Sequence, residues 1–115
     1  MGVKNGDLAS AVEKFCRWLS RSVPILSYEV VDGDSARWRG YAPDKKYDSM
    51  LILKLDFRVL NMRRLNEVLR EVRKEAKFAG LRIVDSYISA EATISSDDLV
   101  PVLGLRLLVK RVRRR

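Results

Sequence analysis

The chain has no histidine and only one cysteine, Cys16, among its 115 residues. Without histidine, the common pairing of a nucleophile with an imidazole base is not available. The sequence also lacks a glycine-rich phosphate loop, a Cys-x-x-Cys pair and a metalloprotease helix motif. We therefore expect a protein that is not an enzyme and that holds no metal or cofactor. Cys16 itself is expected to be a small buried apolar residue, as free cysteines usually are.

Long hydrophobic runs are also absent. No apolar segment approaches the roughly 18 residues that a membrane-spanning helix needs, and residues 1–6 lack the apolar core of a secretory signal. A single thiol cannot form an internal disulfide, which fits a reducing compartment. Because 47% of the residues are nevertheless apolar, the chain is expected to fold. The prediction is one soluble cytoplasmic domain over residues 1–115, with a folded body at 7–112 and flexible ends at 1–6 and 111–115.

Glutamine is missing as well, and arginine outnumbers lysine fifteen to eight. Few amides together with many charges are typical of thermophilic proteins. The formal net charge is +8, and five of the 23 basic residues lie in the last six positions. This balance favours a polyanionic partner, with the terminal arginines acting either as a non-specific clamp or as a solvated tail.

Alternation with a period of two is the strongest pattern that the sequence contains. From Met50 to Val59 every second residue is apolar, which predicts a long strand with one face on a core. The apolar face consists of Leu51, Leu53, Leu55, Phe57 and Val59. The opposite face mixes apolar and charged side chains, namely Met50, Ile52, Lys54, Asp56 and Arg58.

Two amphipathic helices are predicted by apolar residues at helical spacing. The first begins at Asp7 as N-cap and ends before Pro24, and the second has Asn61 as N-cap and Gly80 as the left-handed residue after its end. The expected core residues of the first helix are Leu8, Val12, Phe15 and Leu19. Those of the second are Leu65, Val68, Leu69, Val72 and Ala76.

The remaining segments read as strands joined by polar turns. Residues 25–31 form a strand, Asp32-Gly33 is a hairpin turn, and residues 36–41 return as a second strand. Residues 81–94 and 99–112 form the last two strands around a turn at 95–98. In the first of these, Val84, Ser86, Ile88, Ala90 and Ala92 are expected to face the helices, and in the second Leu103, Leu105, Leu107 and Val109.

The expected element order is therefore α-β-β-β-α-β-β. This order predicts an α+β fold with a mostly antiparallel sheet of about five strands and two helices packed on one face. A ferredoxin-like variant is the nearest familiar architecture, because residues 50–94 read as a strand-helix-strand crossover. The sequence leaves the strand order open.

The acidic pairs Asp32/Asp34 and Asp97/Asp98 could hold a hard cation. Both pairs lie in predicted turns, where aspartate is favoured because its side chain accepts hydrogen bonds from nearby backbone amides. A turn role is therefore the preferred interpretation for each pair.

The open face of the predicted sheet interleaves aromatic, aliphatic and basic side chains. Such a surface suits single-stranded nucleic acid, because bases stack on the apolar groups while cations follow the phosphates. The alternative is that this face is buried in a homo-oligomer, and the two can coexist. The candidate nucleic-acid-binding residues are Arg37, Trp38, Arg39, Tyr41, Lys45, Lys46, Tyr47, Ile52, Lys54, Arg58, Tyr87, Arg106 and Lys110.

Two of these candidates have a second interpretation. Trp38 alternates with Arg37 and Arg39, so it faces the core if the arginines face outward. The core position is preferred and the exposed one stays open. Tyr47 follows two lysines at the end of a loop, where it could stack on a base or pack on the protein surface.

The first helix, the aromatic and basic hairpin that ends in the strand at 36–41, and the helix-covered sheet together resemble the ThermoDBP-related family of hyperthermophilic archaea. The resemblance covers residues 7–112 and is one of architecture and composition. It implies an oligomeric protein that binds single-stranded DNA, favoured over RNA, without sequence preference in a hydrophobic and basic cleft. Some members of that family have a C-terminal leucine-zipper helix, whereas this chain is predicted to end in a strand and an arginine run.

Overall fold

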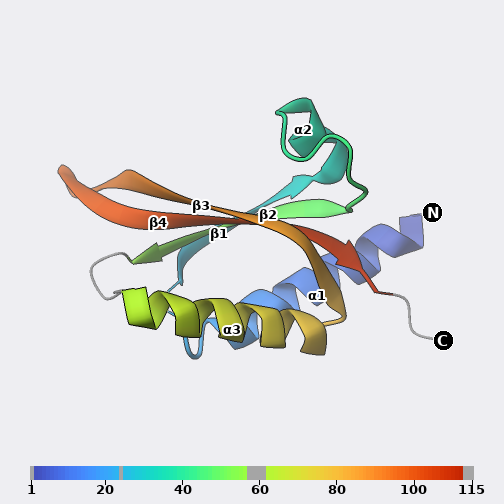
Figure 1. Ribbon diagram of the computed structural model, residues 1–115, viewed down its shortest axis with the longest axis horizontal. Helices are drawn as coiled ribbons and strands as arrows, with labels where there is room; N and C mark the ends of the chain where they lie inside the picture. The colour runs from blue at the N-terminus through green and yellow to red at the C-terminus, as the bar shows by residue number, and fades with distance from the viewer. Residues whose placement is uncertain (1, 24, 57–61, 113–115) are drawn as a thin grey trace.

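The structure is a computed structural model that describes residues 2–23, 25–56 and 62–112. Its helices and strands follow one another in the order drawn in Figure 1. The elements are α1 (Gly2–Leu19), β1 (Ile25–Asp32), α2 (Gly33–Trp38), β2 (Ser49–Asp56), α3 (Met62–Phe78), β3 (Leu81–Ser95) and β4 (Asp98–Arg111). The α+β class is confirmed, whereas the described residues form four strands instead of the five expected.

The four strands lie in the order β1-β2-β4-β3, and every neighbouring pair is antiparallel. As a result β2 and β3 are parallel, with α3 connecting them and β4 inserted between them. This split crossover is a property of the ferredoxin-like arrangement β-α-β-β-α-β. Without the short helix α2, the observed order is α-β-β-α-β-β. Reading it from its last strand gives the same cyclic order, so the topology is a circular permutation of that arrangement.

The topology also divides the chain into two similar halves. Each half consists of a long helix followed by two antiparallel strands, α1-β1-β2 and then α3-β3-β4. In the sheet the second strands of the halves, β2 and β4, lie side by side at the centre, while β1 and β3 form the two edges. The halves are therefore related by an approximate two-fold axis through the β2–β4 seam.

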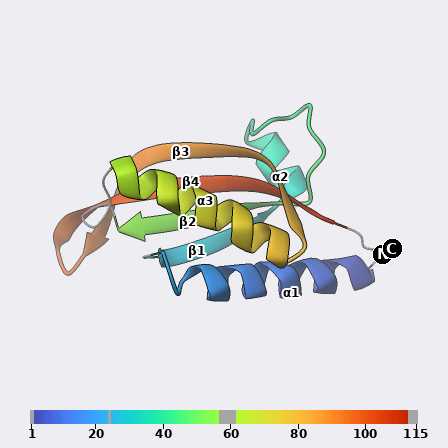
Figure 2. The ribbon, with the colours of Figure 1, turned by 60° about the horizontal axis from the view of Figure 1, so that its bottom comes forward.

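The main core lies between the sheet and the pair α1 and α3, which cover the same face (Figures 1 and 2). We call this the helix face. The predicted apolar positions of β2 and β4 point into it, and so do the predicted stripes of both helices. Its largest fully buried side chains include Phe15, Leu19, Leu53, Leu55, Leu105 and Leu107. The period-two and helical patterns are thus confirmed by burial.

The predicted strand at 36–41 is wrong. The Asp32 carboxylate accepts hydrogen bonds from the Ser35 amide at 3.0 Å and from the Ser35 hydroxyl at 2.8 Å. These bonds make Asp32 the N-cap of α2, so the Asp-Gly pair starts a short helix where a hairpin turn was expected. The Ser35 amide is also the main reason why the pKa of Asp32 is lowered.

Three other expectations about helix ends and turns can be compared with the structure. Helix α1 begins at Gly2, so the expected flexible lead-in at 2–6 is helical and Asp7 lies inside the helix. Gly80 has the expected left-handed backbone, with φ of 77°. The predicted turn at 95–98 is confirmed with positive φ at Ser96 and Asp97, as in a type I′ hairpin. The predictions on Pro24, on Asn61 and on Phe57 to Val59 fall outside the described residues.

The register of β3 differs from the prediction near its start. A bulge between Ile83 and Asp85 shifts the pairing with β4 by one residue. Because one inserted residue exchanges the two faces, Ile83 packs against the main core and Val84 packs on the opposite side, the reverse of the expectation. Beyond the bulge the predicted alternation matches the register, with Tyr87 opposite Arg106.

Candidate functional site

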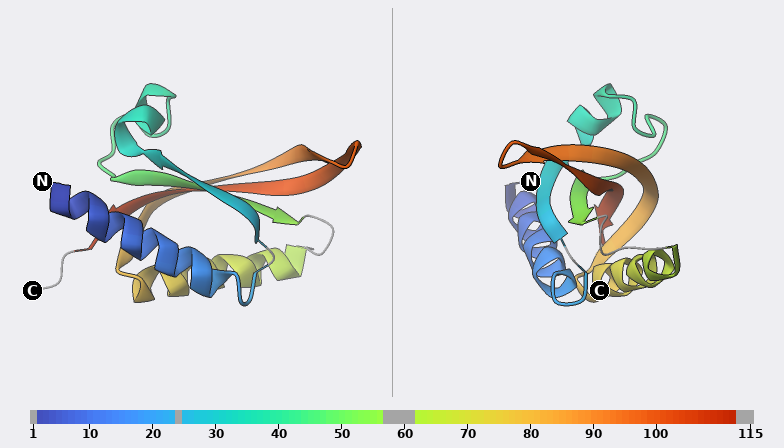
Figure 3. Two further views of the ribbon diagram at one scale, coloured as in Figure 1. Left: turned by 180° about the vertical axis from the view of Figure 1, so that it is seen from behind. Right: turned by 90° about the vertical axis from the view of Figure 1, so that its left-hand side faces the viewer.

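The face of the sheet that turns away from α1 and α3, here called the open face, is partly covered. Residues 33–48, which we call the α2 lobe, connect β1 to β2 and fold over one end of this face (Figures 1 and 3). A second apolar cluster joins the lobe to the sheet, and its buried members are Val31, Ala36, Tyr47, Met50, Ile52 and Leu108. Tyr47 and Ile52, predicted as binding residues, are therefore buried and cannot contact a ligand.

Polar contacts fix the lobe in place. The Arg37 guanidinium donates a hydrogen bond to the Tyr47 carbonyl at 3.0 Å, pairs with Asp34 at 2.7 Å and lies 4.8 Å from the centre of the Tyr47 ring. The Tyr47 hydroxyl donates to the Tyr41 carbonyl. Burial raises the pKa of this hydroxyl, so it stays protonated as a donor. Arg37 thus supports the lobe through three contacts with two residues, Tyr47 and Asp34.

Trp38 is the last residue of α2 and is 88% exposed. The preferred sequence interpretation, which placed it in the core, is wrong because α2 is a helix and its buried side is occupied by Ala36. Arg39 and Lys46 are exposed in the same lobe. Among the described residues neither cation has an ion-pair partner. The lobe thus presents a large aromatic side chain with two available positive charges.

The uncovered part of the open face contains a compact ionic cluster. Lys54 of β2 and Arg106 of β4 both form ion pairs with Glu91 of β3, the latter at 2.8 Å. The Ser89 hydroxyl donates to the same carboxylate at 2.7 Å. The carboxylate lies directly over Gly104, where a Cβ atom would collide with it. Two predicted phosphate-binding cations therefore share one carboxylate within the protein, which offsets one of their two positive charges.

The electrostatics of Glu91 reflect these contacts. Its pKa is lowered to about 2, first by the hydrogen bond from Lys54 and then by those from Ser89 and Arg106. The pKa of Arg106 is raised by the same carboxylate. Sequence reasoning did not single out Ser89 and Glu91. The alternation of β3 placed them on the same face as Tyr87, but their partners depend on the strand order.

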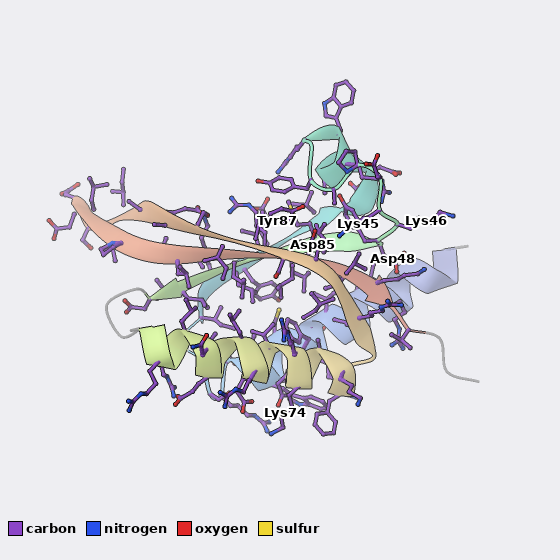
Figure 4. All side chains as sticks on the ribbon, viewed as in Figure 1. Lys45, Lys46, Asp48, Lys74, Asp85 and Tyr87 are labelled. Atoms are coloured by element: carbon purple, nitrogen blue, oxygen red, sulfur yellow. The ribbon has the colours of Figure 1, made fainter. Side chains whose placement is uncertain are left out.

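Tyr41 and Tyr87 meet where the lobe borders the uncovered sheet. Their rings are 5.4 Å apart in an edge-to-face arrangement, and the Arg106 guanidinium lies 5.9 Å from the Tyr41 ring. Nearby, Lys45 pairs with Asp85 at 3.1 Å, and Figure 4 shows both beside Tyr87. The hydrogen bond from Lys45 is the main reason why the pKa of Asp85 is lowered. Of the predicted residues, Tyr41, Tyr87 and Arg106 are thus brought into contact.

Lys110 is exposed near the C-terminal end of β4. It lies next to the lobe, because the amide of Asp48 donates to the carbonyl of its neighbour Val109 at 2.8 Å. The structure therefore gathers Arg39, Lys46 and Lys110 at one end of the molecule. Arg58 and residues 113–115, which were also considered, lie outside the described residues.

The opposite end of the molecule is a two-stranded projection. Among the described residues, β2 ends its pairing with β4 at Asp56 and Val102, and beyond this point the described sheet consists of β3 and β4. We call residues 92–101 the hairpin arm (Figure 1). Ile94 and Leu99 face each other across it and are 75% and 74% exposed. Residues 86–105 contain three acidic side chains and no basic one.

Comparison with known proteins adds no relative. No protein-family model, no curated protein and no solved structure matches the chain. Within the described residues no helix is long and apolar enough to cross a membrane, and no group of three or more acidic or cysteine side chains is arranged to hold a metal ion.

Proposed function

We propose that the protein binds single-stranded nucleic acid, DNA in preference to RNA, through the α2 lobe and without catalysing a reaction on it. Trp38 provides the stacking surface, and Arg39, Lys46 and Lys110 provide charges for the phosphates. The observation that carries the proposal is the exposure of Trp38, 88%, on a lobe whose other aromatic side chains, Tyr41 and Tyr47, pack on the second cluster.

The exposed indole is informative because its surroundings are rigid. Tyr47 and Ala36 are buried beneath the lobe and Arg37 ties its two ends together, so Trp38 is held outward by a fixed backbone. A base that stacks on an aromatic ring of a binding protein contributes about 1–3 kcal/mol. Because the lobe is already ordered, little of that energy is lost to ordering when the strand binds.

The charge distribution supports the same end of the molecule. Arg39, Lys46 and Lys110 are exposed around the lobe, whereas Lys54 and Arg106 on the sheet are paired with Glu91. Phosphate contacts therefore involve the lobe first. Tyr41, Tyr87 and Arg106 form a second contact region beside it, onto which a bound strand can continue. The resemblance to the ThermoDBP-related family implies the same class of ligand.

The direct test is a fluorescence-anisotropy titration with labelled single-stranded DNA, single-stranded RNA and duplex DNA at two salt concentrations. We expect the strongest binding to single-stranded DNA. Even non-specific nucleic-acid binding normally has a Kd of about 10⁻⁴–10⁻⁶ M. Absence of binding to all three ligands below about 100 μM would overturn the proposal.

Two tryptophan variants locate the site. Trp38→Ala should weaken single-strand binding by about 1–3 kcal/mol while leaving the salt dependence unchanged. Trp18→Ala is the matched control, since Trp18 lies on α1, where Lys14 is 4.7 Å from its ring. An equal loss of affinity in both variants would contradict stacking at the lobe.

A protein-interaction module is the second candidate. The hairpin arm favours it, because Ile94 and Leu99 are exposed on a projection whose own charged residues, Asp97 and Asp98, are acidic. The open face itself is a weaker candidate for such an interface, since the lobe covers one end and the Glu91 cluster occupies another part. If the hairpin arm is the functional surface, Trp38→Ala should leave the nucleic-acid affinity unchanged.

A further inference from the structure

The outer edge of β1 is an unprotected strand edge. β1 is the first strand in the sheet order, so its outer side has no partner strand among the described residues. Leu26, Tyr28 and Val30 are 51%, 49% and 47% exposed along it. Unpaired N–H and C=O groups of such an edge readily pair with another strand, and proteins usually guard them with charges, prolines or bulges.

A groove runs beside this edge on the helix face. Its volume is about 370 Å³, and it is lined by Leu8, Ala9, Val12, Glu13, Tyr28 and Val30. All but one of these side chains are apolar, so α1 leaves an apolar strip next to β1 that is not closed by the rest of the described chain. The edge and the groove together form one continuous apolar border.

The other edge of the sheet is built differently. Near its start β3 has a bulge between Ile83 and Asp85, with the charged residues Arg82 and Asp85 on either side. Along β1, the segment 26–31 contains a single charge, Glu29, and its bulge lies at one end, between Ile25 and Ser27. Both edges thus have a bulge, but the one on β1 leaves the segment 27–31 regular, with Glu29 as its only charge.

We propose that two copies of this chain pair through their β1 edges, antiparallel and about a two-fold axis at Tyr28, to form one continuous eight-stranded sheet. The β1 sequence is self-complementary about that residue. Tyr28 then lies opposite Tyr28 of the second copy, Leu26 opposite Val30, and Ser27 opposite Glu29. Such an isologous interface needs only one surface, repeated on both copies.

The charges select this register. A two-fold axis normal to the sheet keeps the helices of both copies on the same face, so only registers centred on a residue are allowed. Centring on Glu29 would place two carboxylates opposite each other, which is destabilising. Centring on Ser27 would place Glu29 opposite the apolar Ile25. In the Tyr28 register Glu29 lies opposite the polar Ser27 of the second copy, and neither of these unfavourable contacts occurs.

The residues paired across the strands in line with Glu29 show which cations flank its carboxylate. Within one copy Glu29 is paired with Ile52 and Ile52 with Arg106. Across the seam Glu29 meets Ser27 of the second copy, which is itself paired with Lys54 of that copy. The carboxylate therefore has a cation two strands away on each side, at roughly 10 Å. This distance is slightly beyond the Debye length of about 8 Å at physiological salt, so the attraction is weak and the register is selected mainly by keeping the two Glu29 carboxylates apart.

The two-fold axis also has a consequence that rests on the proposed function. Because it keeps the open faces on one side, both α2 lobes face the same way, and one strand of nucleic acid can reach both Trp38 side chains. The interface itself does not depend on nucleic acid and can be tested without it.

Cysteine cross-linking tests the register. Cys16 is the chain's only thiol; it is buried, and burial raises its pKa to about 11, so it does not compete under mild oxidation. Directly opposed residues have Cβ atoms about 4.5–5.5 Å apart and diagonal ones about 7–8 Å, while a disulfide needs about 3.5–4.5 Å. Tyr28→Cys should therefore form a disulfide-linked dimer readily. Ser27→Cys and Glu29→Cys should link to each other when mixed, and each only slowly to itself.

Light scattering on a sizing column gives the mass independently. We expect a mass near twice 13.2 kDa for the parent chain, and near the monomer value for Val30→Lys, which places a charge on the edge. If Val30→Lys does not fold by circular dichroism, the cross-linking pattern of the folded cysteine variants decides. A monomeric parent at millimolar concentration, a Val30→Lys variant that folds and stays dimeric, or self-linking of Glu29→Cys as fast as that of Tyr28→Cys would each overturn the interface.

Discussion

The two halves of the chain share the plan helix-strand-strand but join their strands in opposite ways. In the first half β1 and β2 are connected by the α2 lobe, which folds back onto the open face and buries Tyr47 and Ala36. In the second half β3 and β4 are connected by a two-residue turn, and the hairpin arm extends away from the sheet with Ile94 and Leu99 exposed. The shared layers thus provide the scaffold, and the two connections provide the surfaces.

The connections also differ in charge. The lobe and the end of β4 beside it present Arg39, Lys46 and Lys110, whereas residues 86–105 are acidic without a single cation. A polyanion is therefore favoured at the lobe over the hairpin arm. The proposed site and the second candidate function consequently belong to different ends, and the experiments below separate them.

The largest expected effect comes from removing an anchor of the lobe. Tyr47→Ala deletes a buried aromatic ring from the second cluster and should lower the free energy of unfolding by about 3–5 kcal/mol. Ile94→Ala is the matched deletion in the arm, and because that side chain is 75% exposed it should change stability by less than about 0.5 kcal/mol. Urea unfolding of both variants measures the difference. Equal losses would show that the arm is packed as firmly as the lobe.

A smaller effect is expected where the uncovered sheet meets the arm. Glu91→Gln removes the shared carboxylate of Lys54 and Arg106 and should cost about 1.5–3 kcal/mol, the range for hydrogen bonds to charged groups. Because the folded-state pKa is about 2 against an ordinary 4.5, the stabilisation is present above pH 4.5 and is lost as the pH falls towards 2. Thermal unfolding between pH 7 and pH 2 should show this loss in the parent chain and a flatter dependence in Glu91→Gln.

The same variant bears on binding. With Glu91 neutralised, Lys54 and Arg106 become available to phosphates, and the salt dependence of single-strand affinity should steepen. Each added phosphate contact raises the slope of log K against log salt by about 0.7. An unchanged slope would place the bound strand entirely on the lobe, away from the sheet.

The smallest expected effect distinguishes the two ends by charge alone. Arg39→Ala should reduce the salt slope by about 0.7, the value for one lost phosphate contact on a single strand. Asp97→Asn at the tip of the arm should leave the slope unchanged, because no phosphate is held there. Anisotropy titrations over a series of salt concentrations give both slopes. A larger response to Asp97→Asn than to Arg39→Ala would reverse the proposed orientation of the ligand.

The regular parts of the fold could be predicted from the sequence because burial imposes its period on the residues. The alternation from Leu51 to Leu55 and the stripe from Val12 to Leu19 each have one interpretation, and both are confirmed. The segment after Asp32 has two interpretations, since an aspartate can cap a hairpin turn or a helix. The choice depends on contacts of Ala36 with a second cluster that the local sequence does not reveal.

The candidate site could be predicted only in outline for a similar reason. Tyr87 and Arg106 lie opposite each other as the sequence predicted, because the alternation after the β3 bulge is regular. Tyr41 meets them from the α2 lobe and not from the predicted strand. The neutralisation of Lys54 depends on β4 lying between β2 and β3, and strand order is set by packing of the whole chain. Ile83 and Val84 exchanged faces because of the β3 bulge. The bulge could not be predicted, since a single inserted residue leaves no mark in composition.

The place of β4 in the sheet has a consequence for how the protein folds. β4 is the last strand of the chain and the inner neighbour of both β2 and β3, so Ser49 must find Val109, sixty positions later. The β3–β4 hairpin closes over much shorter loops and meets α3 directly before it, which makes α3-β3-β4 the local folding unit. Since closing a long loop costs entropy before any contact offsets it, we expect the joining of the two halves along β2 and β4 to limit the rate of folding.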